Sequence, residues 1–219
     1  MKRLIIAIDG PSGAGKGTVA RALAQALGYR HVDTGAMYRA VGWKAHHDGI
    51  RLTDEAAVAD LARSANLVVE GGVVNIDGYD VTTAIRTPEA DKLASTVARL
   101  PQVREVLVSR QRAIGEQGGV VMEGRDIGSV VFPDADVKIY LDASAEERAR
   151  RRAHDAAHAG SQAGQAAVAE AIQARDLSDK TRAASPLALA PGAVHIDTTD
   201  LPIDAVVERV MALVKEKLR

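Results

Sequence analysis

The loop from Gly10 to Thr18 (GPSGAGKGT) constrains the fold of this 219-residue chain more than any other segment. It fits the pattern G-x-x-x-x-G-K, in which glycines let successive backbone N–H groups converge on phosphate oxygens. Residues 3–9 before it form a short apolar run typical of a strand buried on both faces, and residues 17–27 after it repeat apolar side chains at helical spacing. This strand–loop–helix context predicts a nucleoside triphosphate site at the N-terminus of the helix.

One position departs from the commonest form of this loop. Gly17 stands where most such loops place the Ser or Thr that binds Mg²⁺, and a hydroxyl follows one position later at Thr18. The ending G-K-G-T is similar to that of nucleoside monophosphate kinases rather than to that of GTPases or motor proteins. The chain also contains neither an N/T-K-x-D guanine motif nor a D-x-x-G switch motif. We therefore expect the triphosphate to be a phosphoryl donor.

Strand and helix patterns alternate along most of the chain. Further buried strands are predicted at 119–123 and 137–142, and another strand at 193–197. Helices are predicted at 34–47 and 53–64, from Pro88, Pro101 and the capping box of Ser144 and Glu147, after residue 164, and from about 202. The alternation predicts an α/β fold of the P-loop NTPase kind, with a central parallel sheet flanked by helices.

Residues 67–82 have a different character from the rest. Two apolar runs are separated by Gly71-Gly72 and followed by Asp77-Gly78. Such a pattern predicts a small antiparallel meander. Within a chain of alternating strands and helices, this meander is interpreted as an insertion.

Composition excludes several classes of function. The chain has no cysteine, so disulfides and thiolate chemistry are excluded, and 3% aromatic residues are too few for a base-stacking platform. The net charge of −1 argues against a surface that coats polyanions, although 20 of the 28 cations are arginine, the better partner for phosphate. No apolar run approaches the roughly 18 residues of a membrane span. A cytoplasmic location is the expectation.

Three further segments place arginine beside a carboxylate or hydroxyl near the ends of predicted elements, where α/β proteins gather their sites. They are 33–39 (DTGAMYR), 124–126 (GRD) and 175–182 (RDLSDKTR). The spacing of Arg175, Asp179 and Arg182 is equally typical of an ion-paired surface helix. The 124–126 segment also fits a simple turn. From the residues alone, both interpretations stay open.

These segments carry a close resemblance to the bacterial cytidylate kinases over nearly the whole chain. The residues that carry it are 9–18, 33–39, 124–133 (GRDIGSVVFP), and Arg175-Asp176 with Asp179 and Arg182. Thr34 and Ser129 are conservative variations on that pattern. The resemblance implies ATP-dependent phosphorylation of CMP and dCMP to CDP and dCDP with Mg²⁺, by a monomer without nucleic-acid or membrane partners.

The resemblance also implies roles for individual residues. The ATP phosphates are expected to bind Gly10, Pro11, Ser12, Gly13, Ala14, Gly15, Lys16, Gly17 and Thr18. In the acceptor site, Arg39, Arg125 and Arg182 would hold the phosphate of CMP, and Ser95, Arg104 and Asp126 would read the cytosine. Arg175 and Asp179 would lie near the ribose, and Thr34 would also line the pocket. Lys16, Arg125 and Arg182 are the expected catalytic residues. No direct metal ligand is assigned, with Thr18 as a candidate.

The family pattern divides the chain into a core (1–33, 119–147 and 176–219), a monophosphate-binding region (34–118, with the insertion at about 66–86) and a lid (about 148–166). The lid would bring one or more of Arg148, Arg150, Arg151 and Arg152 to the transferring phosphoryl group. The same arginines also fit a solvated basic helix face or a weak RNA contact. His154 and His158 have no third ligand nearby and are not interpreted as a metal site.

Two other functions stay open at this point. A kinase for another small acceptor, such as UMP, AMP or shikimate, would share the phosphate loop. A non-enzymatic P-loop regulator or RNA-binding protein would instead use the arginines at 148–152. The sequence shows no obvious pair of base and nucleophile, which agrees with transfer to a phosphate monoester, because that acceptor is already an anionic nucleophile.

Overall fold

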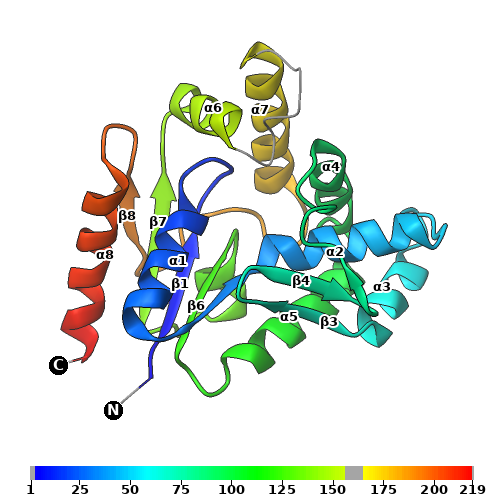
Figure 1. The fold of residues 1–219 in the computed structure, drawn as a ribbon, viewed down its shortest axis with the longest axis horizontal. Helices are drawn as coiled ribbons and strands as arrows, with labels where there is room; N and C mark the ends of the chain where they lie inside the picture. The colour runs from blue at the N-terminus through cyan, green and yellow to red at the C-terminus, as the bar shows by residue number, and fades with distance from the viewer. Residues whose placement is uncertain (1–2, 156–164, 219) are drawn as a thin grey trace.

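A five-stranded parallel sheet forms the centre of the protein (Figure 1). The computed structural model describes residues 3–155 and 165–218. In sheet order the strands are β2 (Arg30–Asp33), β6 (Val120–Gly124), β1 (Ile5–Asp9), β7 (Val137–Asp142) and β8 (Val194–Asp197). The predicted parallel α/β sheet is thus confirmed.

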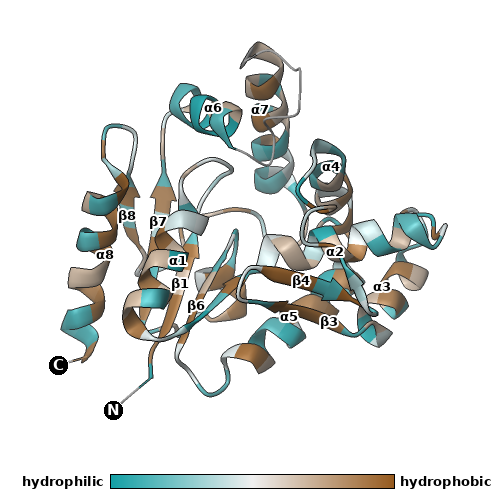
Figure 2. Cartoon of the chain, viewed as in Figure 1, coloured by the Kyte–Doolittle hydropathy of each residue, from teal (hydrophilic) through white to brown (hydrophobic). Residues whose placement is uncertain are grey.

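Both faces of this sheet are covered, which explains why the central strands β1 and β6 are largely apolar (Figure 2). Helices α1 (Lys16–Leu27) and α8 (Ile203–Leu218) pack on one face, where Leu23 and Val210 join the core around Ile6 and Ile8. Helix α5 (Pro101–Gly115) and the π-helix η1 (Ile127–Val131) lie on the other face, against Ala7 and its neighbours. Alternate residues of β1 therefore serve two separate cores.

The segment between β2 and β6 folds around cores of its own. It comprises α2 (Thr34–His47), α3 (Glu55–Ser64), the antiparallel strands β3 (Leu67–Glu70), β4 (Val73–Ile76) and β5 (Tyr79–Asp80), α4 (Pro88–Val97) and α5. The predicted meander is confirmed. Gly42 lets α2 and α4 cross closely, because a Cβ there would lie 2.9 Å from the Leu93 Cβ.

Helices α6 (Ala145–His154) and α7 (Gln165–Thr181) pack against each other above the sheet (Figure 1). The predicted capping box is only half formed: the Ser144 hydroxyl accepts from the Glu147 N–H, whereas the Glu147 carboxylate binds Arg150 and Arg151. The predicted lid runs into residues 156–164, which lie outside the described residues. Among the helices that the structure describes, none combines the length and apolarity needed to cross a membrane.

Two elements have no counterpart in the sequence predictions. The sequence predictions assign no strand to the residues of β2, since its sequence RHVD buries a single side chain, Val32. It is an edge strand that pairs with β6 alone, so an apolar pattern is not required of it. The π-helix η1 follows Asp126 directly, and the sequence predictions assign no element to its residues.

Candidate active site

The carboxyl ends of β1, β2 and β6 open into one pocket of about 780 Å³. The phosphate loop forms one wall of this pocket. The opposite wall is formed by side chains from α2, α4, α5 and α7, among them Arg39, Ser95, Arg104 and Arg175. Parallel strands with crossover helices gather their loops at this edge of the sheet, so segments distant in sequence meet there.

The phosphate loop has the conformation that its glycines permit. Gly13 and Gly15 have φ angles of +81° and +89°, which side-chain-bearing residues rarely adopt. Gly10 is required by packing, because a Cβ there would lie 1.9 Å from the carbonyl oxygen of Leu141. Gly15 caps the N-terminus of α1 without a side-chain acceptor. The loop therefore presents backbone N–H groups and a helix N-terminus to the pocket, the arrangement that binds phosphate.

Lys16 lies at the base of this loop and is buried. Its Nζ donates a hydrogen bond to the Pro11 carbonyl oxygen at 2.7 Å. Burial, with repulsion from Arg125, lowers the pKa of Lys16 to about 7. An anion bound next to it would restore its charge.

Three of the predicted acceptor-site arginines are held by two buried carboxylates. Arg104 forms an ion pair with Asp126, and Arg182 Nη2 lies 3.6 Å from the second oxygen of the same carboxylate. Arg125 Nε donates to Asp179 at 2.8 Å. The ion-paired surface helix considered for residues 175–182 is therefore wrong for Asp179 and Arg182, which are buried and face Arg125 and Asp126.

A second group of arginines surrounds Asp91 of α4. Arg175 Nη1 lies 2.8 Å from Asp91 Oδ1, and Arg152 of α6 donates to the other oxygen. Arg39 Nη1 is 3.8 Å from Asp91, while its Nη2 donates to Asp33 at 2.8 Å. Although burial opposes the shift, Arg39 lowers the pKa of Asp33 to about 2. Asp91 thus draws together arginines from three helices.

Several guanidinium nitrogens in these two groups are buried without a hydrogen-bond partner among the described residues. They are Arg39 Nε, Arg104 Nε, Arg175 Nε and Arg182 Nη2. Buried donors are satisfied in nearly all folded proteins, and exceptions mark places where a ligand or water completes the bonding. All four side chains line the pocket. Their free donors suit an anionic ligand with several oxygen atoms, such as a phosphate ester.

The remaining predicted residues also lie at the pocket. Thr34 and Ser95 both line it, and the Thr34 hydroxyl donates to the Glu123 carbonyl oxygen at 2.7 Å. All the predicted acceptor-site residues are therefore brought together. Their individual roles stay predictions.

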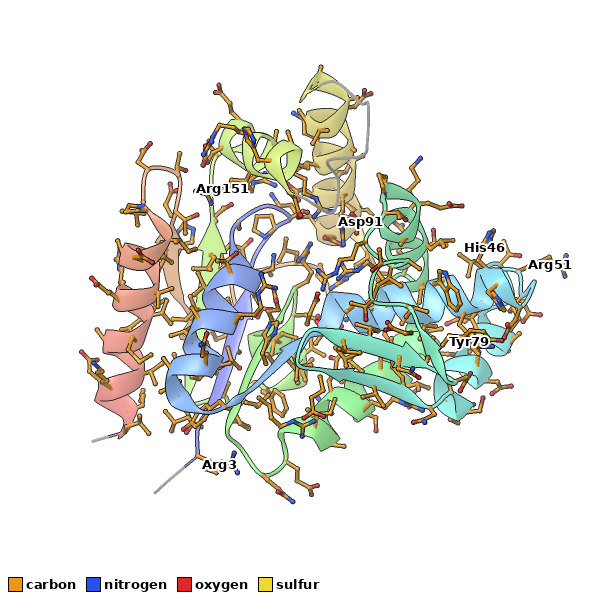
Figure 3. All side chains as sticks on the ribbon, in the orientation of Figure 1. Arg3, His46, Arg51, Tyr79, Asp91 and Arg151 are labelled. Carbon is orange, nitrogen blue, oxygen red and sulfur yellow. The ribbon has the colours of Figure 1, made fainter. Side chains whose placement is uncertain are left out.

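The four arginines predicted for the lid differ in their surroundings. Arg150 is exposed and pairs with Glu147, whereas Arg151 donates to the Thr198 hydroxyl at 2.9 Å and carbonyl at 2.6 Å (Figure 3 labels Arg151). These two and Arg152 line the pocket. His154 lines it as well, His158 lies outside the described residues, and no metal-binding group of three His, Asp or Glu occurs within 3–155 and 165–218.

Arg148 is buried beneath the phosphate loop rather than facing the pocket. Its guanidinium donates to the Ser12 and Ala143 carbonyl oxygens at 3.1 and 3.0 Å and to Asp176 at 2.5 Å. These contacts join α6 and α7 to the loop. A lid arginine that moves to the transferring phosphoryl group would have to break all of them, so the contacts indicate a structural part for Arg148.

Asp9, Glu123 and Asp91 are among the carboxylates in or beside the pocket to which the sequence predictions gave no site role. Asp9 accepts the Ile127 and Gly128 N–H groups, each at 2.8 Å, and burial raises its pKa to about 6. Glu123 binds His31 Nε2 at 2.9 Å and lines the pocket. Asp9 and Glu123 could have been predicted as site residues, because each is an acidic residue at the end of a buried strand. No sequence feature pointed to Asp91, because acidic residues are common in the first turn of helices.

Known proteins resemble this chain along its whole length. Residues 6–216 match the family described as cytidylate kinase. The chain is 50% identical to the cytidylate kinase of Desulfitobacterium hafniense (99% of this chain, 95% of that protein) and 52% identical to that of Pelotomaculum thermopropionicum (95% of each). The solved structure of a gluconokinase from Sinorhizobium meliloti shares the fold, with a TM-score of 0.51, 16% identity, and coverage of 98% and 93%. With these matches and the site geometry together, the chain belongs to the cytidylate kinase family.

Proposed function

We propose that the protein transfers the γ-phosphoryl group of ATP to CMP and dCMP, forming CDP and dCDP. The observation that carries the proposal is the single pocket in which the phosphate loop faces an arginine-lined wall. The reaction needs two polyanions brought together, and these walls supply the matching cations. Membership of the cytidylate kinase family supports the same reaction.

The proposed mechanism assigns positioning and charge neutralisation to named residues. The phosphate loop binds the ATP phosphates, and Lys16 contributes its charge next to the β- and γ-phosphates. Arg39, Arg125 and Arg182 hold the acceptor phosphate in line with the γ-phosphate. The acceptor oxygen is already anionic, so no side chain has to remove a proton from it. Arg125 and Arg182 then stabilise the negative charge that spreads over the transferring group.

Recognition of the cytosine is assigned to Asp126, Arg104 and Ser95. A carboxylate accepts a hydrogen bond from the exocyclic amino group of cytosine, and uracil carries an oxygen at that position. The ion pair with Arg104 orients the Asp126 carboxylate. Arg175 and Asp179 are proposed to lie near the ribose.

The residues at the phosphate loop suit a Mg²⁺ ion that arrives with ATP. Mg²⁺ is usually bound by one or two protein oxygens together with substrate phosphates and water. Thr18 and Glu123 line the pocket beside the loop, and a Cβ on Gly17 would lie only 3.2 Å from Glu123 Oε1. These two are the candidates to hold the ion directly or through water, where it would neutralise phosphate charge.

An ADP-release assay with a panel of acceptors tests the proposal. We expect steady ADP release with CMP and dCMP, less with UMP, AMP and dTMP, and almost none without an acceptor. Faster turnover of UMP or AMP than of CMP would identify a different acceptor. Equal ADP release with and without acceptor would indicate a nucleotide-hydrolysing P-loop protein. Cytoplasmic location and a monomeric state belong to the same proposal.

A further inference from the structure

Asp91, which Figure 3 labels, forms ion pairs with three arginines that come from three other helices. Arg39 belongs to α2, Arg152 to α6 and Arg175 to α7. Asp91 itself sits in the first turn of α4. No role for Asp91 follows from the expected binding of ATP or CMP, and no other carboxylate among the described residues pairs with all three arginines.

These ion pairs are largely withdrawn from solvent. The side chain of Asp91 is 16% exposed, and those of its three arginine partners are 12 to 21% exposed. Exposed ion pairs contribute little because water and salt screen them, but pairs with this degree of burial are screened less. Without the carboxylate, three guanidinium groups would repel one another across a short gap. The negative charge of Asp91 therefore offsets this repulsion and holds the three guanidinium groups together.

The three arginines belong to opposite walls of the pocket. Arg39 lies on the acceptor side, where Asp33 is its other partner. Arg152 lies on α6, which packs on the phosphate loop through Arg148 and on Thr198 through Arg151. The Asp91–Arg152 contact thus joins α4 of the acceptor region to α6 on the donor side.

We infer that Asp91 is a positioning residue for phosphoryl transfer. It fixes Arg152 of α6 against the acceptor wall, so that the donor and acceptor sides of the pocket keep a fixed position relative to each other. Asp91 touches neither substrate and acts through its arginines. Among the residues proposed to hold the CMP phosphate, Arg39 and Arg125 keep their own carboxylate partners, Asp33 and Asp179, without it. Arg175, proposed to lie near the ribose, has Asp91 itself as its ion-pair partner. Binding of CMP is consequently less dependent on Asp91 than the transfer step is. This inference rests on the proposed function.

Steady-state kinetics of Asp91→Asn separate positioning from binding. We expect kcat to fall about ten- to hundredfold, the size of effect that misplacement of reacting groups produces. The KM for CMP should change by less than about threefold. Asp91→Glu should recover part of the kcat. Glu89→Gln, which removes an exposed acid from the same helix turn, is the matched control and should behave like the wild type.

A double-mutant cycle tests whether Asp91 acts through Arg152. If it does, Asp91→Asn combined with Arg152→Gln should be no slower than Arg152→Gln alone. Multiplicative losses in the double variant would overturn the inference. So would a wild-type kcat in Asp91→Asn, or a raised KM for CMP with kcat unchanged.

A distance measurement tests the contact without turnover. The chain has no cysteine, so Glu89→Cys on α4 and Glu146→Cys on α6, both exposed, can carry the only two spin labels. We expect one narrow distance distribution with Asp91 present and a broader or longer one in Asp91→Asn. An unchanged distribution would overturn the inference. Absence of CMP-dependent turnover in the wild type would instead count against the proposed function, and the label distances would still decide the role of Asp91.

Discussion

Lys16 shows how the fold prepares a single charge for its ligand. In water a lysine is protonated up to a pKa of 10.5, but burial and Arg125 lower the pKa of Lys16 to about 7. Between these two values the unfolded chain binds one more proton than the folded chain, so this group makes the free protein more stable as the pH rises from about 7. Bound phosphate reverses the effect by favouring the charged form.

Proton uptake on ATP binding should report this change at Lys16. At pH 8 about nine-tenths of the Lys16 side chains are neutral in the free protein, and the triphosphate should recharge them. Calorimetry in two buffers of different ionisation enthalpy should therefore give an uptake approaching one proton. Lys16→Ala should abolish the uptake and lower kcat by at least about a hundredfold. Equal apparent enthalpies in both buffers would contradict the shifted pKa.

Asp126 is the residue at which the proposed base preference is decided. Asp126→Asn keeps the shape of the side chain but replaces one acceptor oxygen by a donor. We expect the ratio of kcat/KM for CMP over UMP to fall by about five- to hundredfold, while the KM for ATP is unchanged. The variant should also be less stable, because Arg104 and Arg182 lose a buried partner. An unaltered CMP preference in the folded variant would remove Asp126 from cytosine recognition.

At the scale of elements, the π-helix η1 links the two halves of the site. It begins directly after Arg125 and Asp126, and its first N–H groups would be unsatisfied at a buried helix start. The carboxylate of Asp9, at the end of β1, accepts both of them. Strand β1, which leads into the phosphate loop, thereby fixes the backbone that directly follows Arg125 and Asp126.

Substitution of Asp9 should affect stability in a pH-dependent way. Asp9→Asn can accept only one of the two N–H groups well, so we expect a loss of about 1–3 kcal/mol in the free energy of unfolding at pH 4. Burial raises the pKa of Asp9 to about 6, so between pH 4 and 6 the folded wild type holds more protons than the unfolded chain and loses stability as pH rises.

Urea unfolding of both proteins at pH 4, 5, 6 and 7 measures this contribution. The advantage of the wild type over Asp9→Asn should shrink with rising pH by up to about 3 kcal/mol and level off above pH 6. A constant difference across the series would show that the Asp9 carboxyl titrates normally.

For the whole molecule, the near-zero net charge conceals a strongly cationic pocket. The net charge is −1, yet Lys16 and a large share of the arginines line one pocket. Such a concentration attracts phosphate esters without making the outer surface a binding site for polyanions. Because the pocket is lined by segments from residue 12 to residue 206, its shape exists only in the complete fold.

A ligand that spans both walls should therefore stabilise the folded state most. A bisubstrate analogue, in which adenosine and cytidine are joined by a polyphosphate, should raise the thermal unfolding temperature more than ATP and CMP added together at the same concentration. A single ligand at a hundred times its dissociation constant stabilises the folded state by about 2.7 kcal/mol. Joining the two ligands covalently increases this stabilisation, because binding of one half raises the effective concentration of the other half at its site. If the analogue stabilises no more than ATP alone, the two sites do not share this pocket.

Helices and strands with a strong periodic pattern of apolar residues could be predicted from the sequence. Elements that form only because of contacts with distant parts of the chain could not. The helix from 34 to 47 begins where Asp33 caps it, and the strand at 137–142 is apolar enough to be identified in isolation. By contrast, β2 is a strand because β6 offers it a hydrogen-bonding edge. The π-helix η1 exists because Asp9, more than a hundred residues earlier, satisfies its N-terminus.

The acceptor-site arginines were expected from the resemblance to the cytidylate kinases. The residue pattern by itself determined the phosphate loop, the α/β class and the small antiparallel insertion. Local spacing encodes these features, since glycine freedom, helical period and apolar runs act between near neighbours in the chain. Only the tertiary structure decided which carboxylate holds which arginine. It placed Arg148 under the loop, paired Arg104 with Asp126, and gathered three helices around Asp91. Charge pairing depends on distance and burial in space, and no spacing along the chain records either.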